Sequence, residues 1–420
     1  MTALRIGLIG LGTVGTEVAR GLIEDAPLLA GRAGRALRLA GVAVRDTGRR
    51  RGVDLGDVVV SGDAVMLVEA QSVDVVVEVM GGVATTLPLL RRALTAGKSV
   101  VTANKQLIAA HGQELHLLAR AHGCQLRFSA AVGGGTPILE LLTGSLRGDP
   151  LTEIAGVLNG TTNLMLEMMA EGMSFRDAVA DAQARGFAET DPSEDVDGLD
   201  AAAKIAICAA LAWHCAVDRD NVATIGIREV DPVDLAHAAA LGCTVKLLAR
   251  AVSAEGTLAL TVAPTVIPLS GNTLSALAQL GGAGNGVVVL SKRNGPVTVL
   301  GSGAGGRPTS SAVLSDVVAI ASGEPMAQWG ADAVIHASAE ERESGAYLRL
   351  QVSDPGAADV IAQQLEDRGV SVEATVSGVD ELVVLTRPAT EAVLDRAVET
   401  IETLPAVVAV AARLAYVGAG

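Results

Sequence analysis

The sequence predicts an α/β fold with three parts: a doubly wound domain with a parallel sheet, an α+β domain, and a small βαββαβ domain. Three observations support this prediction. Short apolar strands alternate with helical patterns through the first 130 residues. Longer helices, followed by strands, begin at Gly133, and two strand–helix–strand patterns close the chain after Ala346.

The first domain is expected to span residues 1–131. Buried apolar strands that are separated by helices indicate parallel pairing through helical crossovers. The expected strands are residues 4–10, 37–44, 73–79, 98–104 and 124–130. The expected helices are residues 13–23, 85–96 and 105–121.

The second domain is expected over residues 132–304, and one more helix should return to the first domain within residues 305–325. The patterns predict helices at 136–146, 161–171, 175–185, 200–212 and 308–322. They predict strands near 155–158 and between 250 and 300. A polar linker at 331–345 and a small domain at 346–420 complete the expected order, which is ferredoxin-like at its end.

The composition indicates a globular protein. Half of the 420 residues are apolar and 19% are charged, which excludes a disordered chain. No apolar run of membrane length occurs, and the chain enters a structured motif at once, so neither an anchor nor a signal peptide is expected. A net charge of −15 argues against nucleic acid or a membrane as partner. Four cysteines without metal or disulfide spacing favour the reducing cytoplasm: Cys124, Cys208, Cys215 and Cys243.

A glycine-rich turn joins the first expected strand to the first expected helix. In GLGTVG, Gly10 permits a tight turn, Gly12 lets a pyrophosphate approach the backbone, and Gly15 allows close packing of helix on strand. The helix start at Thr13 and Val14 offers N–H groups to phosphate. A merely structural glycine turn is the alternative. The position after an apolar strand favours a Rossmann-type dinucleotide site.

The end of the second expected strand bears on which nicotinamide cofactor is bound. An acidic residue there would bind the ribose 2′-hydroxyl of NAD. The sequence instead has Arg45, followed by Asp46 and by Arg49, Arg50 and Arg51. Arginine suits a 2′-phosphate, so we predict NADP over NAD, although Asp46 leaves use of NAD open and an exposed basic loop is the alternative.

Two lysines stand where chemistry is expected. Lys105 follows a strand and stands at the start of a helix, where the helix dipole does not stabilise a positive charge. Ligands of open parallel sheets bind at such strand ends. Asp200 and Lys204 are four apart, hence on one helix face, among apolar neighbours. A lysine in such a site can pass a proton to a developing alkoxide. A solvated helix-start lysine and a structural salt bridge are the alternatives.

A dense acidic loop precedes Lys204. Its carboxylates are Glu189, Asp191, Glu194, Asp195, Asp197 and Asp200. A calcium loop, a pocket for a substrate ammonium and a solvated turn are all compatible with this spacing, although the glutamate that ends an EF-hand loop is missing.

Five segments occur in order along the chain: GLGTVG, VTANKQLIAAHG, AAVGGGTPILE, GVLNGTTNLML and GFAETDPSEDVDGLDAAAKIAI. Over roughly residues 1–325 they resemble the homoserine dehydrogenase family, and the tail from Tyr347 resembles an ACT regulatory domain. The resemblance implies reversible reduction of L-aspartate 4-semialdehyde to L-homoserine with NADPH or NADH, in threonine and methionine biosynthesis. It implies a homodimer or homotetramer, in the monofunctional form without a fused aspartokinase.

The resemblance also assigns roles by position. Lys204 would give the proton to the aldehyde oxygen, and Lys105 would assist beside nicotinamide and substrate. Glu189 would hold the substrate ammonium, while Asp200 would bind the reacting hydroxyl and orient Lys204, with support from Asp195. Gly160 and Thr161 would lie near the polar end of the substrate. Three further glycines would border the cofactor: Gly81, Gly186 and Gly303.

Three departures from the family pattern stand out. A glutamate that usually helps to bind a monovalent cation is replaced by Ser129, so a Na⁺ or K⁺ site would rely on three backbone carbonyls, those of Val132, Gly134 and Thr136. Leu164 stands where an aromatic residue is common. The turn after the first strand of the tail, at residues 354–358, is one residue shorter than in ACT domains, which makes threonine feedback doubtful.

Two rival functions are weighed against this resemblance. Another Rossmann-fold dehydrogenase of amino-acid pathways, such as aspartate-semialdehyde dehydrogenase, needs a nucleophilic cysteine, and Cys208 and Cys215 lie in an apolar helix instead. A non-catalytic ACT-bearing sensor would not need its catalytic lysines, yet Lys105 and Lys204 are both present.

Overall fold

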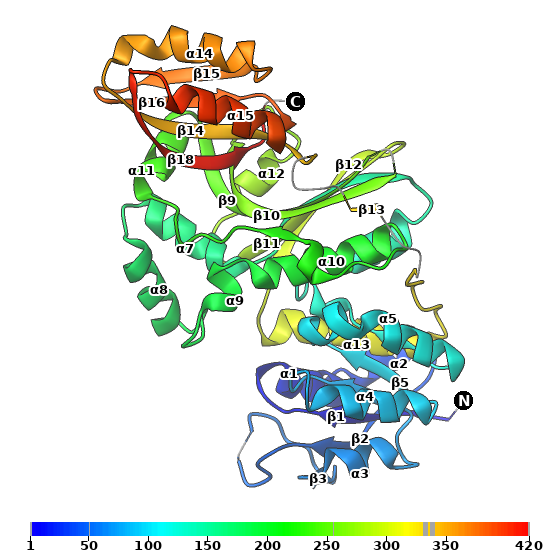
Figure 1. Cartoon of the computed structure of the whole chain (residues 1–420). Coiled ribbons are helices and arrows are strands. Elements are labelled where there is room, and N and C mark those ends of the chain that lie inside the picture. Colours follow the sequence, from blue (N-terminus) through cyan, green and yellow to red (C-terminus); the bar gives the residue numbers. More distant parts are fainter. Residues whose placement is uncertain (1, 50, 255, 331–334, 337–340, 419–420) are drawn as a thin grey trace. The chain divides into compact units, whose positions relative to one another are not determined.

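The computed structural model describes residues 2–49, 51–254, 256–330, 335–336 and 341–418. Its contacts divide the chain into two compact units (Figure 1). The first comprises residues 1–150, 206–219 and 299–333, and the second comprises residues 151–205, 220–298 and 334–420. Residues 132–150 therefore pack with the nucleotide-binding part. Much of the expected linker, residues 331–334 and 337–340, lies outside the described residues.

The first unit contains a six-stranded parallel sheet in the order β3-β2-β1-β4-β5-β6. This is the strand order of a dinucleotide-binding Rossmann fold, so the predicted fold class is confirmed. The strands are β1 Leu4–Ile9, β2 Leu37–Ala43, β3 Val60–Ser61, β4 Val75–Glu78, β5 Ser99–Thr102 and β6 Leu126–Arg127. The helices between them are α1 Thr13–Glu24, α2 Ala26–Ala33, α3 Ala64–Glu69, α4 Thr86–Thr95 and α5 Lys105–Ala121.

The sequence patterns missed three of these elements: α2, β3 and α3. Each is short, from two to eight residues, so it offers little periodicity. One signal was available for α3, since Asp63 directly precedes it and its carboxylate accepts a hydrogen bond from the Met66 N–H at 2.9 Å. An acidic residue before a helix is a common N-cap.

Helix α13, Gly306–Ser322, returns to the first unit as predicted. It packs against α1 and α2 (Figure 1). Val313 and Val317 join the hydrophobic core that contains Val18 and Leu22 of α1. Two distant segments therefore share one core.

The predicted helix at 136–146 was only partly right. Helix α6 covers Ile138–Glu140, and a π-helical turn follows at Leu141–Ser145. Pro137 cannot donate a backbone hydrogen bond, so the helix begins after it. The Thr143 hydroxyl donates to the Leu139 carbonyl oxygen at 2.7 Å, and such bonds compete with the regular helical pattern.

The second unit is built on a long mixed sheet in the order β12-β11-β7-β9-β10-β18-β14-β16-β15. The strands of its first half are β7 Leu151–Val157, β9 Cys243–Ala254, β10 Thr257–Pro268, β11 Gly284–Ser291 and β12 Gly295–Ser302. Its helices are α7 Gly160–Ala170, α8 Phe175–Ala184, α9 Ser193–Val196, α10 Leu199–Ala212, α11 Pro232–Ala240 and α12 Ser275–Ala278. The sequence patterns missed α11, although Asp231 and Pro232 form a typical helix start.

The tail has the predicted βαββαβ order. Its main elements are β14 Glu343–Val352, α14 Ala358–Asp367, β15 Val372–Ser377, β16 Glu381–Thr386, α15 Glu391–Glu402 and β18 Val407–Tyr416. Both helices pack on one face of the sheet through a shared core. Short parallel pairing of Thr265 and Val266 with Ala415 and Tyr416 joins β18 to β10. The tail sheet therefore continues the sheet of the preceding part of this unit.

The other face of the tail sheet meets α11 through buried charges. The Asp234 carboxylate accepts hydrogen bonds from the Tyr347 hydroxyl at 2.9 Å and from Arg349 Nε at 2.7 Å. Arg349 Nη1 also donates to Glu381 at 3.1 Å, and His237 of α11 lies 3.1 Å from the other oxygen of Glu381. These contacts fasten the tail to α11.

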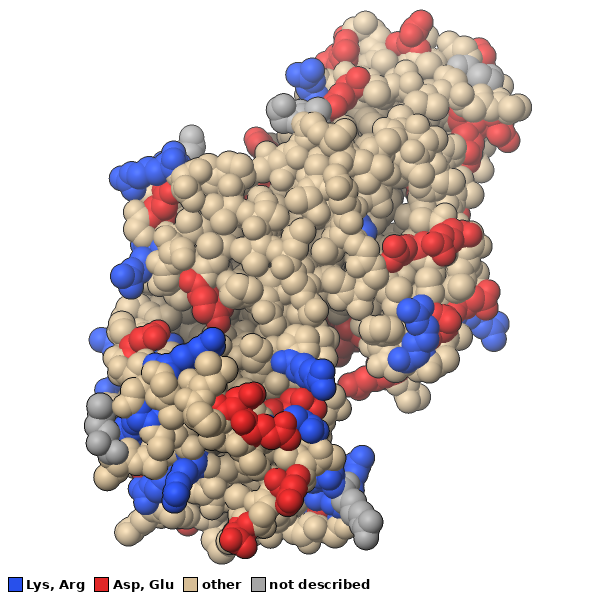
Figure 2. Space-filling model, turned by 180° about the vertical axis from the view of Figure 1, so that it is seen from behind, with Lys and Arg blue, Asp and Glu red and all other residues tan. Residues whose placement is uncertain are grey.

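No helix among the described residues is long and apolar enough to cross a membrane. On the face shown in Figure 2, acidic and basic side chains are interspersed among uncharged ones rather than gathered by sign.

Candidate functional site

The glycine loop at the end of β1 has the geometry that a dinucleotide needs. Gly10 has φ +97°, and a Cβ there would lie 2.9 Å from the Met80 backbone nitrogen. A Cβ on Gly15 would lie 2.2 Å from the Gly10 carbonyl oxygen, so only glycine allows this helix to pack on this strand. Gly12 has open space in front of it and caps α1 at Thr13. The residues present therefore fit a pyrophosphate at the helix N-terminus.

A second loop beside it, after β4, is held by a buried carboxylate. Glu78 is fully buried and accepts hydrogen bonds from the backbone N–H groups of Met80 at 2.8 Å and Gly81 at 2.9 Å. The Thr102 hydroxyl donates to its other oxygen at 2.6 Å. Burial raises the pKa of Glu78, and the hydrogen bonds partly oppose that shift. Glu78 therefore fixes the loop that carries Gly81.

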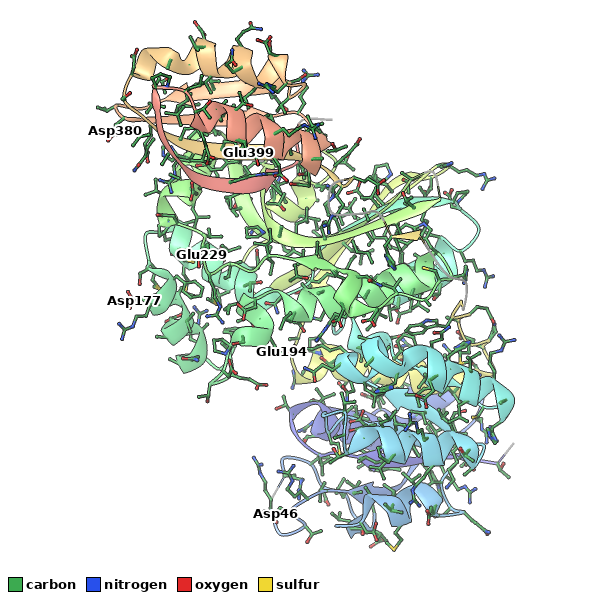
Figure 3. The ribbon with its side chains drawn as sticks, viewed as in Figure 1. Asp46, Asp177, Glu194, Glu229, Asp380 and Glu399 are labelled. Atoms are coloured by element: carbon green, nitrogen blue, oxygen red, sulfur yellow. The ribbon has the colours of Figure 1, made fainter. Side chains whose placement is uncertain are left out.

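The basic segment after β2 is exposed. Arg45 and the neighbouring Asp46 (Figure 3) follow the end of the strand after one buried residue, Val44. The Asp46 carboxylate accepts a hydrogen bond from the Gly48 N–H at 2.9 Å. Arg51 folds back onto the carbonyl oxygens of Asp46 and Arg49. Arg50 lies outside the described residues. The first charged residue after the strand is therefore an arginine rather than an acid.

Lys105 occupies the first position of α5, as predicted, and is partly buried. The preceding residue, Asn104, caps the helix by accepting a hydrogen bond from the Leu107 N–H at 3.1 Å. Its amide group also donates to the Gly82 carbonyl oxygen at 2.9 Å. Asn104 thereby ties the start of α5 to the loop that contains Gly81.

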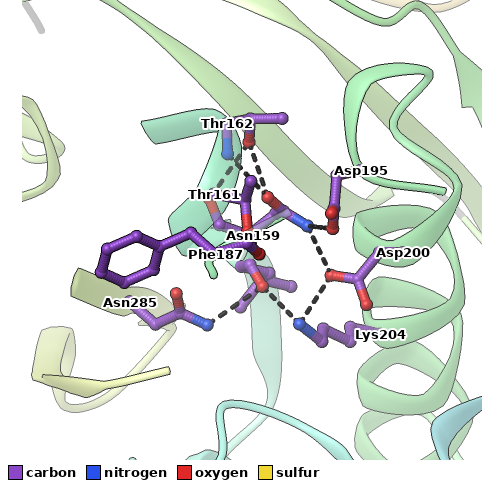
Figure 4. A network of polar contacts seen from close by, with 9 residues as sticks. Asn159, Thr161, Thr162, Phe187, Asp195, Asp200, Lys204 and Asn285 are labelled. Carbon is purple, nitrogen blue, oxygen red and sulfur yellow. Dashed lines mark hydrogen bonds and ion pairs between the residues drawn. The ribbon is translucent and has the colours of Figure 1, made fainter. Parts of the chain in front are cut away.

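The second unit holds a buried polar cluster around Lys204 (Figure 4). Lys204 Nζ lies 2.7 Å from Asp200 Oδ2, one helical turn away on α10. The amide of Asn159 donates to the same Asp200 oxygen at 2.9 Å and to Asp195 at 2.6 Å. Lys204 is 8% exposed and Asp200 is 1% exposed, so this ion pair is not a solvated surface salt bridge. The structure thus brings together three of the predicted residues.

A backbone carbonyl completes the surroundings of the lysine. Lys204 Nζ donates to the Leu158 carbonyl oxygen at 2.7 Å, and Asn285 Nδ2 donates to that oxygen at 3.0 Å. Leu158 follows β7, whereas Asn285 lies on β11. Lys204 is therefore held by its own helix and by the sheet.

The start of α7 lies at this cluster. Asn159 caps the helix by accepting a hydrogen bond from the Thr162 N–H at 2.8 Å. A Cβ on Gly160 would lie 2.4 Å from the Ala283 carbonyl oxygen, so glycine is required. The Thr161 hydroxyl donates to the Phe187 carbonyl oxygen at 3.1 Å (Figure 4). The predicted Gly160 and Thr161 therefore lie next to the lysine cluster.

The acids of the loop before α10 have separate environments. Asp191 accepts hydrogen bonds from Ser193, which lowers its pKa. Asp197 forms an ion pair with Arg228, and Glu194 is exposed on α9 (Figure 3). Glu189 is also exposed, and its carboxylate has no hydrogen-bond partner within the described part of the chain. The structure thus leaves Glu189 outside the hydrogen-bonded cluster.

The remaining predicted glycines lie in turns. Gly186 has φ +75° in the exposed loop after α8. Gly303 follows β12, and its carbonyl oxygen would lie 2.5 Å from a Cβ on Gly134. Gly303 therefore contacts the segment that carries the predicted cation carbonyls.

Ser129 pairs with a buried acid from α13. Its backbone N–H and its hydroxyl donate to Asp316 at 2.9 and 2.8 Å. Burial raises the pKa of Asp316 to about 7, and the Ser129 hydrogen bonds only partly offset it. Among the described residues there is no cluster of three or more metal-ligating side chains. The hydroxyl of Thr136 is buried and has no hydrogen-bond partner among the residues that the structure describes.

Asp316 should make folding stability depend on pH. Between its ordinary value of 3.8 and about 7, the folded protein keeps a proton that the unfolded chain has released. The free energy of unfolding therefore falls as pH rises through this window, and the loss is complete above it. As pH rises through this window, the free energy of unfolding of Asp316→Asn should increase relative to that of the wild type by up to about 4 kcal/mol. Above the window this difference should stay constant. Urea unfolding of both proteins at several pH values measures this, and a difference independent of pH would contradict it.

Family models match both parts of the chain. Residues 10–129 match the NAD-binding domain of homoserine dehydrogenase, and residues 137–318 match the homoserine dehydrogenase domain. The chain belongs to the homoserine dehydrogenase family. It is therefore an NAD(P)-dependent oxidoreductase that acts on a CH–OH group, interconverting L-homoserine and L-aspartate 4-semialdehyde.

Homoserine dehydrogenases of known sequence or structure align over most or nearly all of the chain. Those of Mycobacterium bovis and Corynebacterium glutamicum are 39% and 38% identical; the alignments cover 99% and 97% of this chain and 98% and 94% of theirs. A homoserine dehydrogenase from Thiobacillus denitrificans, known from its crystal structure, is 34% identical in sequence and has a TM-score of 0.92. The match covers 100% of this chain and 99% of that one. A hyperthermophilic archaeal homoserine dehydrogenase in complex with NADPH is 28% identical in sequence and has a TM-score of 0.63. That match covers 77% of this chain and 99% of the archaeal one.

Sequence reasoning missed several residues of the Lys204 cluster and of the loop after β4. Asn159 had a signal, because asparagine directly before a helix is a common cap. Glu78 also had one, as an acid that ends a run of valines. Neither Asn285 nor the Leu158 carbonyl had a signal in the sequence.

Proposed function

We propose that Lys204 gives the proton to the substrate oxygen during reduction of L-aspartate 4-semialdehyde and removes it during oxidation of L-homoserine. The observation that carries this proposal is the pair of contacts at 2.7 Å with Asp200 and with the Leu158 carbonyl oxygen. They direct two N–H groups of a buried ammonium and leave a third for the substrate. A positioned group of this kind is suited to general acid–base catalysis.

The reaction then follows from the cluster. When bound, the reduced nicotinamide supplies the hydride for the carbonyl carbon. Lys204 donates its proton to the carbonyl oxygen, which becomes the hydroxyl group of homoserine, and the neutral amine remains beside Asp200. Asp200 keeps Lys204 aligned, and Lys105 assists beside the nicotinamide and the substrate.

The amino-acid end of the substrate is assigned to the acidic loop and the start of α7. Glu189 is exposed and so available to bind the ammonium group, while Asp195 supports the cluster through Asn159. Gly160 and Thr161 stand at a helix N-terminus, which favours the substrate carboxylate.

Glu189→Gln should raise the KM for L-homoserine about tenfold and leave kcat within about twofold, because it removes a charged partner of the ammonium. Steady-state kinetics of the variant measure this split. Glu194→Gln, an exposed acid of the same loop, serves as control and should change neither constant. A defect confined to kcat would contradict the role of Glu189.

The cofactor proposed is NADP, with NAD as the alternative. Arg45 is exposed at the end of β2, where a 2′-phosphate would lie, and a guanidinium binds phosphate through two parallel hydrogen bonds. The cofactor-binding set proposed is Gly10, Gly12, Thr13, Val14, Gly15, Arg45, Gly81, Lys105, Gly186 and Gly303.

The remaining proposals concern a cation, assembly and regulation. A Na⁺ or K⁺ ion would bind the carbonyls of Val132, Gly134 and Thr136, and the unpartnered Thr136 hydroxyl is a further oxygen of the kind such ions prefer. We further propose a homodimer or homotetramer, an ACT-like regulatory role for the tail, and a cytoplasmic location, which suits four buried cysteines that form no disulfide within the described part of the chain.

The main proposal is tested with purified protein, L-homoserine and either NADP or NAD, by following the absorbance of the reduced cofactor between pH 7 and 10. Sodium or potassium is supplied. Reduction of cofactor is expected, faster with NADP, and it should be nearly lost in Lys204→Met. An undiminished rate in that variant would overturn the role of Lys204.

A further inference from the structure

We propose that Asn285 is a positioning residue for Lys204 that acts through the main-chain carbonyl of Leu158. This proposal rests on the role proposed above for Lys204. Asn285 is distant in sequence from the acidic loop and from both lysines, and no sequence motif marks it.

The geometry joins three elements at one oxygen atom. The Leu158 carbonyl oxygen accepts hydrogen bonds from Lys204 Nζ on α10 and from Asn285 Nδ2 on β11, at 2.7 and 3.0 Å (Figure 4). A carbonyl oxygen has two lone pairs, so these two donors occupy both. The Asn285 amide therefore fixes the direction of the carbonyl that holds Lys204.

Asn285 is itself rigidly placed. Its strand pairs with β7, with Gly286 opposite Val157. The loop before it is fastened to α7 and β9: Asn163 donates to the Gly282 carbonyl oxygen at 2.7 Å, and Lys246 donates to that of Leu280 at 2.7 Å. Asn285 is 1% exposed. A side chain anchored in this way can hold a partner in one geometry.

A purely structural role does not explain an asparagine here. Asn285 Oδ1 is buried and has no hydrogen-bond partner in the described part of the chain. A buried unpaired acceptor is unfavourable, and the Leu158 carbonyl would keep a donor in Lys204 without Asn285. A leucine of similar shape would avoid that cost. The amide donor is therefore retained for its effect on the lysine.

The effect is geometric. The Asn285 amide occupies one lone pair of the Leu158 carbonyl oxygen, so Lys204 Nζ is held between the other lone pair and Asp200 Oδ2. Removing the amide should let the carbonyl group turn and should loosen the lysine that it holds.

The test is Asn285→Leu in the full-length protein. We expect kcat to fall at least about tenfold, since small misplacements of a catalytic group are costly, with KM for L-homoserine within about threefold. The thermal unfolding midpoint should stay equal or rise, so a loss of kcat would not reflect unfolding. Asn285→Ser, which is too short to reach the Leu158 carbonyl, carries the same kinetic expectations if the leucine variant does not fold.

Two further variants separate the alternatives. Asn272→Leu removes an amide of the same unit that caps the turn at Leu274, so it should lower stability and leave kcat unchanged. In a Lys204→Met background, Asn285→Leu should have no additional effect on kcat, because Asn285 acts through that lysine. A wild-type kcat in Asn285→Leu, or an additive loss in the double variant, would overturn this proposal. An unchanged rate in Lys204→Met alone would overturn the proposed function instead.

Discussion

Lys204→Met is expected to lower the turnover of L-homoserine oxidation by at least about a hundredfold, the usual scale for removing a general acid–base group. Methionine keeps the length and most of the volume of the side chain, so the packing around α10 is disturbed little. It has no proton to exchange with the substrate oxygen. The absorbance of the reduced cofactor under saturating substrate measures the loss.

The variant also leaves a buried carboxylate without its cation. Asp200 is 1% exposed and would keep the Asn159 amide, so the free energy of unfolding should fall by about 3–5 kcal/mol. Adding Asp200→Asn should restore much of this stability without restoring turnover. If the double variant recovered activity together with stability, the loss in Lys204→Met would reflect unfolding and not chemistry.

Arg349→Met is expected to be the most destabilising change in the tail, by about 3–5 kcal/mol. The variant leaves Asp234, which is 1% exposed, with only the Tyr347 hydroxyl as a hydrogen-bond donor from the tail. Burial, together with the neighbouring Asp234, raises the pKa of Tyr347, so this hydroxyl remains a donor but supplies no charge. Thermal unfolding of the full chain, followed by circular dichroism, measures the loss.

Two variants control this prediction. Arg413→Met removes the contacts with Asp395 and Glu391 on α15, which are more exposed to solvent, and should cost less than about 1 kcal/mol. Asp234→Asn combined with Arg349→Met removes both buried charges and should be more stable than Arg349→Met alone. An equal loss in Arg349→Met and Arg413→Met would show that the buried cluster does not fasten the tail to α11.

Much of the first unit could be predicted because its signals are local. The Rossmann turn needs glycines at fixed spacing, and the structure shows close backbone contacts at Gly10 and Gly15. The pairing of Asp200 with Lys204 followed from helical periodicity alone, since residues four apart share a face. The order of strands and helices in the tail was likewise visible as alternating periodicities.

Other features had no local signal. The six acids between Glu189 and Asp200 looked alike in sequence, yet Asp200 is buried beside Lys204, Asp197 pairs with Arg228, and Glu189 faces solvent. Arg228, the partner of Asp197, and Asn159, which donates to Asp195 and Asp200, come from segments far away in the chain. Spacing within the loop could therefore not distinguish structural acids from those at the site.

The sequence by itself determined the fold class, the family resemblance and the identity of the two lysines, because glycine turns, helical spacing and ordered motifs are properties of short segments. Only the tertiary structure decided what holds Lys204 in place. The Leu158 carbonyl and Asn285 reach it through the pairing of β7 with β11, and that register depends on the packing of the whole sheet. The docking of the tail on α11 through Asp234 and Arg349 was decided in the same way. These two charged side chains pair strongly only because the fold buries both of them away from water.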